Sequence, residues 1–98
     1  MKCKISEKAR EDLISIWEYT FENWSLNQAD RYYQIIIDKF DEICSKPDIG
    51  KSYETLRKGY WGAIVKSHII FYRLKSKNEI EIIRILHQRM DLKSRLNE

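Results

Sequence analysis

Two apolar runs near the end of the chain constrain the fold more than any other feature. They are HIIFYRL at 68–74 and EIEIIRILH at 79–87, joined by the polar turn KSKN. Because side chains alternate along a strand, both runs predict strands that are apolar on both faces, with Arg73 and Arg84 among the apolar residues. Strict alternation places four residues on one face of the second strand: Ile80, Ile82, Arg84 and Leu86.

The first half of the chain has the periodicity of two helices. Apolar residues recur at steps of three and four through AREDLISIWEYTFENW, after a helix start at Ser6. The pattern restarts at SLNQ, where Ser25 and Gln28 form a capping box, and it ends at Pro47 and Gly50. With almost no loop between them, the helices are expected to form an antiparallel hairpin.

The whole pattern predicts an α+β fold in one domain, residues 1–98. Shorter strands are expected at MKCKI and at 55–58, and residues 64–66 are expected to run on towards HIIFYRL, which gives a sheet of about four strands beside the hairpin. The hairpin covers only one sheet face, so the other face is expected to expose aliphatic side chains between arginines. Exposed patches of this kind usually mark an interaction site. We therefore expect a partner that accepts hydrogen bonds from Arg73 and Arg84.

Charge and composition limit the kind of partner and the cell compartment. Residues 1–50 carry seven Lys and Arg against ten Asp and Glu, a net charge of −3, whereas residues 51–98 carry eleven against five, a net charge of +6. The basic half predicts an acidic partner, either nucleic acid or an acidic protein segment. No secretion signal or membrane-spanning run is recognisable, so a cytoplasmic protein is expected, with Cys3 and Cys44 as reduced thiols.

The two histidines are the candidates for chemistry. His68, His87 and the two cysteines lack metal-motif spacing, so we expect neither a metal nor another cofactor. His87 has the residue type to act as acid or base in RNA cleavage, with Arg84 or Arg89 stabilising the phosphorane, although a histidine at a strand end is more often structural. Three cations near the C-terminus suit either a nucleic-acid patch or a short final helix capped by Asp91: Arg89, Lys93 and Arg95.

Six fragments in this order resemble the ParE toxins of the RelE/ParE superfamily of bacterial toxin–antitoxin systems. They are AREDLISIWEYTFENW, QADRYYQIII, KPDIG, LRKG, SHIIFYR and RILHQRMD. The resemblance implies a mostly antiparallel sheet with a two-helix hairpin and a short C-terminal helix. It also implies a ParD-like antitoxin, bound in a heterotetramer or larger complex, and contact with operator DNA only through that antitoxin.

For activity, the resemblance implies inhibition of DNA gyrase by trapping its cleavage complex, without bond-breaking by the toxin itself. The alternative is a RelE-like, ribosome-dependent mRNA endoribonuclease that would use His87, Arg89 and Arg84. Ile69 stands where the nucleases have a sheet arginine, and no tyrosine follows His87, which favours gyrase. The expected antitoxin-binding residues are Trp17, Ile69, Phe71, Arg73, Ile82 and Arg84. The expected target-binding residues are Trp61, Arg84, His87 and Arg89.

Overall fold

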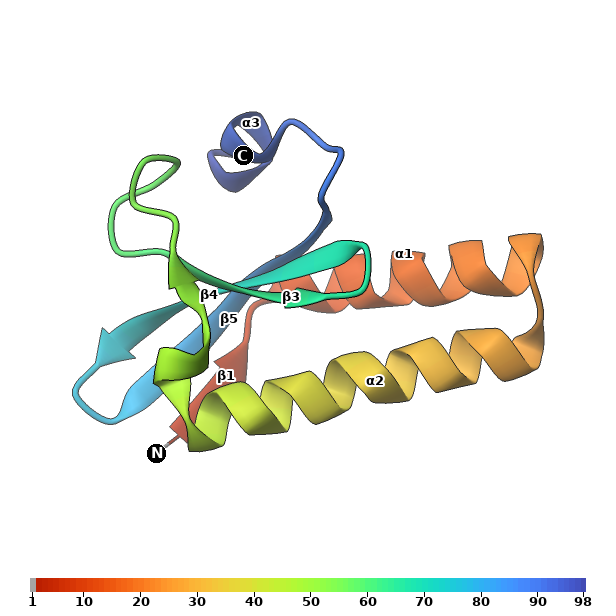
Figure 1. The fold of residues 1–98 in the computed structure, drawn as a ribbon, viewed down its shortest axis with the longest axis horizontal. Helices are drawn as coiled ribbons and strands as arrows, with labels where there is room; N and C mark the ends of the chain where they lie inside the picture. The colour runs from red at the N-terminus through yellow and green to blue at the C-terminus, as the bar shows by residue number, and fades with distance from the viewer. Residues whose placement is uncertain (1) are drawn as a thin grey trace.

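A hairpin of two helices covers one face of a five-stranded sheet in the computed structural model, which describes residues 2–98 (Figure 1). The sheet has the order β1-β5-β4-β3-β2, and all pairings are antiparallel except that of β1 with β5. This confirms the α+β fold, with one strand more than expected. The elements are β1 (Lys2–Ile5), α1 (Glu7–Asn23), α2 (Leu26–Ser45), the 3-10 turn η1 (Pro47–Ile49), β2 (Lys51–Ser52), β3 (Trp61–Val65), β4 (His68–Ser76), β5 (Glu79–His87) and α3 (Leu92–Leu96).

Both long helices begin directly after the capping residues that the sequence predicts, Ser6 and Ser25. The Ser6 hydroxyl accepts a hydrogen bond from the Ala9 backbone N–H at 3.0 Å, and the Ser25 hydroxyl accepts one from the Gln28 N–H at 3.1 Å. Each bond satisfies one of the unpaired donors at a helix start. The main core lies between the hairpin and the sheet, where these side chains are buried: Leu13, Ile36, Phe40, Ile43, Ile70, Tyr72, Ile80, Ile82 and Ile85.

A β-bulge at Ile83 breaks the alternation of β5. Phe71 pairs with Arg84, but its neighbour Tyr72 pairs with Ile82, so Ile83 has no counterpart on β4. A bulge inserts one extra residue and changes the phase of the side chains that follow it. Ile82 therefore faces the hairpin, whereas Arg84 faces the other side of the sheet. The prediction of one continuous face from Ile80 to Leu86 is wrong for this reason.

The second face of the sheet is covered by the chain itself. The loop between β2 and β3 and the short helix α3 close over it, burying Tyr60, Ile69, Phe71, Leu86 and Leu96 in a second core. The expectation of an exposed apolar sheet face is therefore wrong. Residues 55–58 form turns in this loop and not a strand. Residues 64–66, expected to run on towards HIIFYRL, belong to the separate strand Trp61–Val65 and to the turn that follows it.

A disulfide bond joins Cys3 in β1 to Cys44 in the last turn of α2, with a Cα–Cα distance of 5.9 Å. The prediction of two reduced thiols is wrong, because the parallel pairing of β1 with β5 brings the N-terminal strand beside the end of the hairpin. Within residues 2–98, neither long helix is apolar enough over its length to cross a bilayer. Met1, included in the predicted first strand, lies outside the described residues.

Candidate partner-binding groove

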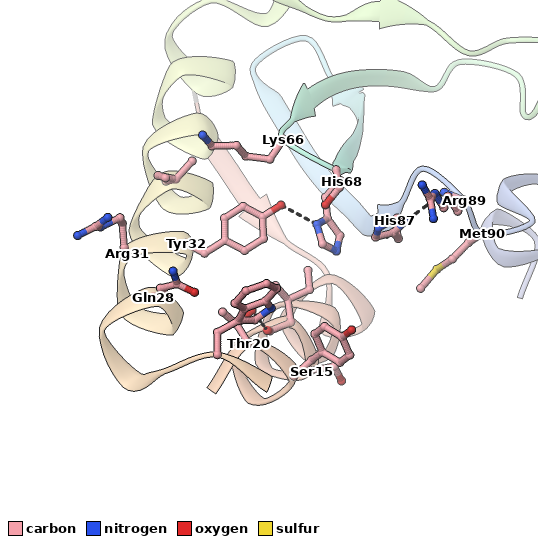
Figure 2. A pocket seen from close by; sticks show the side chains of 15 residues that line it. Ser15, Thr20, Gln28, Arg31, Tyr32, Lys66, His68, His87, Arg89 and Met90 are labelled. Atoms are coloured by element: carbon pink, nitrogen blue, oxygen red, sulfur yellow. Dashed lines mark hydrogen bonds between the residues drawn. The ribbon is translucent and has the colours of Figure 1, made fainter. Parts of the chain in front are cut away.

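A groove of about 990 Å³ opens between the outer half of the hairpin and the nearby end of the sheet (Figure 2). One wall comes from α1 and α2, and the other comes from the turn between β3 and β4 and the residues that follow β5. Helical spacing directs Gln28, Arg31, Tyr32 and Ile35 of α2 to one side of that helix. The apolar and aromatic part of the lining is Ile16, Tyr19, Trp24, Tyr32, Ile35 and Met90.

The charged side chains of the groove all have the same sign. Arg31, Lys66 and Arg89 contribute cations, and within residues 2–98 no Asp or Glu side chain is part of the lining. Lys66 has a φ of 55°, in the left-handed region, which forms the tight turn that carries it to the rim. A surface that combines aromatic area with cations suits an occupant with apolar side chains and carboxylates or phosphates.

Two histidines lie opposite each other at the sheet end of the groove. His68 on β4 pairs directly with His87 on β5, and the ring centroids are 5.2 Å apart in an edge-to-face arrangement. The Tyr32 hydroxyl lies 2.7 Å from Nδ1 of His68 (Figure 2). Burial, together with the nearby His87, lowers the pKa of His68 from 6.5 to about 4. His68 is therefore neutral at pH 7.

Hydrogen bonds assign a different tautomer to each imidazole. The Tyr32 hydroxyl has one proton for two partners, the Val65 carbonyl at 3.2 Å and Nδ1 of His68 at 2.7 Å. When the hydroxyl donates to the carbonyl, Nδ1–H of His68 donates to the hydroxyl, and Nε2 of His68 keeps a free lone pair. Nδ1 of His87 accepts from the Arg89 backbone N–H at 3.1 Å, so neutral His87 carries its proton on Nε2. The two imidazoles thus offer one hydrogen-bond acceptor, Nε2 of His68, and one donor, Nε2–H of His87.

Comparison with known proteins gives the family. A family model described as the ParE toxin of the type II toxin–antitoxin system parDE matches residues 3–92. The chain belongs to the ParE toxin family. Two similar relatives are both called Toxin ParE1. One, from Mycobacterium tuberculosis H37Rv, is 34% identical over 88 residues and 90% of each chain, and the other, from Caulobacter vibrioides, is 36% identical over 93 residues and 95% of each chain.

A solved structure supports the same fold for this ParE-family toxin. A chain from the structure titled "Chromosomal ParDE TA system from P. aeruginosa" superposes with a TM-score of 0.78 at 22% sequence identity. The match covers 89% of this toxin and 95% of the other chain. The hairpin and sheet are therefore shared with that chain across most of both molecules.

Arg84, which the sequence suggested for antitoxin, target and RNA, does not line the groove. It lies on the second sheet face, with its side chain 11% exposed, and donates hydrogen bonds to Asp12, to the Arg95 carbonyl and to Glu98. The hydrogen bonds to Asp12 raise the pKa of Arg84 further above its ordinary value. Arg84 therefore connects α1, β5 and α3. The expectation that it lies on an exposed sheet face is wrong, and its binding roles stay predictions.

The other predicted binding residues of this toxin lie in different parts of the molecule. Ile69, Phe71 and Ile82 are buried in the two cores, so the exposure expected of them is wrong. Arg73 pairs with Glu81 and remains partly exposed. Trp61 is 40% exposed, as expected, but lies outside the groove. His87 and Arg89 are the predicted site residues that come together in the groove, and their binding roles stay predictions.

Four residues that line the groove were not among the site residues predicted from the sequence: Tyr32, His68, Arg31 and Lys66. Tyr32 follows the helical period of α2, which suits either a core or a partner groove, and a lone histidine such as His68 suits a packed or hydrogen-bonded position. The useful signal is the spacing of Gln28, Arg31, Tyr32 and Ile35, which places a cation and a tyrosine on one helix face. The groove itself joins three segments that are far apart in the sequence, which no local pattern reveals.

Proposed function

We propose that this toxin inhibits DNA gyrase by trapping its cleavage complex and is neutralised by a ParD-like antitoxin whose acidic, amphipathic tail lies in the groove. The observation that carries the proposal is the lining of the groove, which combines aromatic side chains with Arg31, Lys66 and Arg89 and lacks carboxylates in the described chain. Such a surface attracts an anionic segment and gives it apolar contacts.

Similarity to the ParE toxins supports the remaining features of the proposal. The toxin acts in the cytoplasm by binding and not by its own bond-breaking, and it needs no cofactor. With its antitoxin it forms a heterotetramer or larger complex, which contacts operator DNA only through the antitoxin. Arg89 and His87, at the free end of β5, are the residues we assign to gyrase.

The test uses purified toxin and purified gyrase. Toxin is expected to reduce supercoiling and to increase the linear DNA recovered when cleavage complexes are denatured. Arg89→Glu is expected to weaken this effect at least tenfold, because it reverses a groove charge. Lys75→Glu is the matched control, since Lys75 is an exposed β4 residue outside the groove. Unchanged supercoiling and cleavage at high toxin excess would refute inhibition of gyrase.

A second candidate, ribosome-dependent mRNA cleavage, is favoured by the complementary tautomers of His68 and His87. Nε2 of neutral His68 accepts the proton of a ribose 2′-hydroxyl, and O2′ forms a bond to phosphorus while the bond from phosphorus to O5′ breaks. Protonated His87 gives a proton from Nε2 to O5′, leaving a 2′,3′-cyclic phosphate, and Arg89 stabilises the charge on the phosphorane. Protonation of His87 at Nδ1 requires its hydrogen bond from the Arg89 N–H to open.

Ribosomes translating a defined mRNA distinguish the two candidates. Cleavage predicts cyclic phosphate ends that disappear in both His68→Ala and His87→Ala. Intact mRNA in the presence of a toxin that inhibits gyrase would eliminate the nuclease. Cut mRNA together with unaffected gyrase would replace the first proposal with the second.

A further inference from the structure

A second apolar surface lies on the side of the hairpin that faces away from the sheet. Three of its side chains are largely exposed, Ile14 at 51%, Phe21 at 47% and Tyr33 at 41%. With half-buried Trp17 and with Asp30 they line or border a shallow hollow between α1 and α2. Because a helix turns once in about 3.6 residues, these positions lie opposite the α1 and α2 residues that line the groove. We call this surface the outer face.

Two interactions order Trp17 within the outer face. The rings of Trp17 and Phe21 stack with centroids 5.3 Å apart and an angle of 13° between their planes. The Trp17 indole N–H donates to the Asp30 carboxylate at 3.0 Å, which links α1 to α2 across the hollow. Ordered aromatic side chains lose little conformational freedom on binding, and such residues are enriched in protein interfaces.

The charge around the outer face is opposite to that of the groove. Positions three or four residues away from its apolar side chains are their neighbours on a helix surface. Those that are charged are three acids and one base: Glu11, Glu18, Asp30 and Arg10. All four are exposed. An apolar centre with an acidic rim is therefore available on one side of the hairpin, while the basic groove lies on the other.

We propose that the outer face binds a cationic protein segment, with apolar side chains flanked by Lys or Arg. Charge complementarity selects this occupant over the alternatives. The acidic rim repels the phosphates of nucleic acid and of anionic lipid. A symmetric pair of toxins would place the acidic rims of two identical faces against each other, which disfavours a second copy. The acidic antitoxin tail proposed for the groove is also disfavoured here.

The test uses two synthetic helical peptides of about 14 residues with the same leucine spacing, one flanked by Lys and the other by Glu. Each is titrated into the full-length, ¹⁵N-labelled toxin, and the indole N–H signal of Trp17 and the amide signals of Ile14 and Tyr33 are followed by NMR. The Lys peptide is expected to shift these signals saturably, and the Glu peptide is not.

Charge-reversal variants provide the control. Glu11→Lys combined with Glu18→Lys is expected to weaken binding of the Lys peptide about tenfold, because two rim attractions become repulsions. Glu42→Lys is expected to leave binding unchanged, since Glu42 is an exposed acid on α2 paired with Lys39 and lies outside the outer face. These substitutions change exposed side chains, and retained amide spectra show that the fold is intact.

Three results would overturn the proposal. They are saturable binding of the Glu peptide at the outer face, equal weakening by Glu42→Lys and by the double variant, and a Lys peptide that leaves the outer-face signals unshifted at millimolar concentration. The measurement needs neither gyrase nor antitoxin. The outcome for the outer face is therefore independent of the function proposed for the groove.

Discussion

Arg84 donates two hydrogen bonds to Asp12, from Nε to Oδ2 at 2.8 Å and from Nη2 to Oδ1 at 3.0 Å. Oδ2 of Asp12 also accepts the backbone N–H of Ile85 at 2.9 Å. β1 pairs only with the first part of β5, up to Ile82. The Asp12 carboxylate therefore satisfies a backbone donor on the part of β5 that β1 does not cover, and this mostly buried pair fastens α1 to the sheet.

Removing one partner of this ion pair is expected to be costly. Arg84→Ala leaves the Asp12 carboxylate mostly buried without its cation, so the free energy of unfolding is expected to fall by about 3 kcal/mol. Arg73→Ala is the matched control, because its side chain is 44% exposed and such pairs contribute less than about 1 kcal/mol. Urea unfolding followed by circular dichroism measures both. Equal losses in the two variants would contradict a structural role specific to Arg84.

The disulfide is expected to contribute substantially to stability. Cys3 and Cys44 are 41 residues apart, and closing a loop of that size restricts the unfolded chain by about 3 to 4 kcal/mol. Replacing both with Ser should lower the free energy of unfolding by that amount, and adding a thiol reductant to the wild-type chain should produce a similar loss. Reductant should not affect the double variant. Identical unfolding of the wild type with and without reductant would show that the bond is absent in solution.

Stability is expected to fall as the pH drops through the range set by His68. In the folded protein its pKa is lowered to about 4, whereas in the unfolded chain it is near 6.5. The unfolded state therefore binds the proton first, so this contribution to stability is complete above pH 6.5 and is lost progressively between pH 6.5 and 4. NMR titration of the His68 ring gives its pKa directly. His68→Gln should show a shallower decline of stability over that range, and a folded-state pKa near 6.5 would contradict the prediction.

Much of the fold follows from local patterns, but the cover of the second sheet face does not. Ser6 and Ser25 are recognisable caps, and Pro47 marks the end of the hairpin. The bulge at Ile83 cannot be recognised from the sequence, because the run around it is apolar at almost every position. The loop around Tyr53 is too short for periodicity to show. The short C-terminal helix capped by Asp91 was expected and is confirmed, but no local pattern places it over the sheet. A sheet that was predicted to need a partner is therefore closed by its own chain.

Binding of the antitoxin is expected to depend on groove cations that sequence reasoning did not select. Arg31→Glu should lower the affinity for the cognate antitoxin at least tenfold, because it places a carboxylate against an acidic tail. Lys75→Glu, with the same charge change outside the groove, should have little effect. Calorimetry at several salt concentrations measures both, and the affinity of the wild type should decrease as salt rises. An Arg31→Glu variant with wild-type affinity would show that the antitoxin binds outside the groove.

Because β1 pairs with β5, the sheet of a newly made molecule cannot be completed until β5 has been synthesised. Lys2 pairs with Glu79, so the first strand has no neighbour until nearly the whole chain has been synthesised, which takes roughly 4 to 15 seconds at cellular rates. His87 and Arg89, which complete the groove, are made later still. The groove of a nascent chain is therefore incomplete for almost the entire time of its translation.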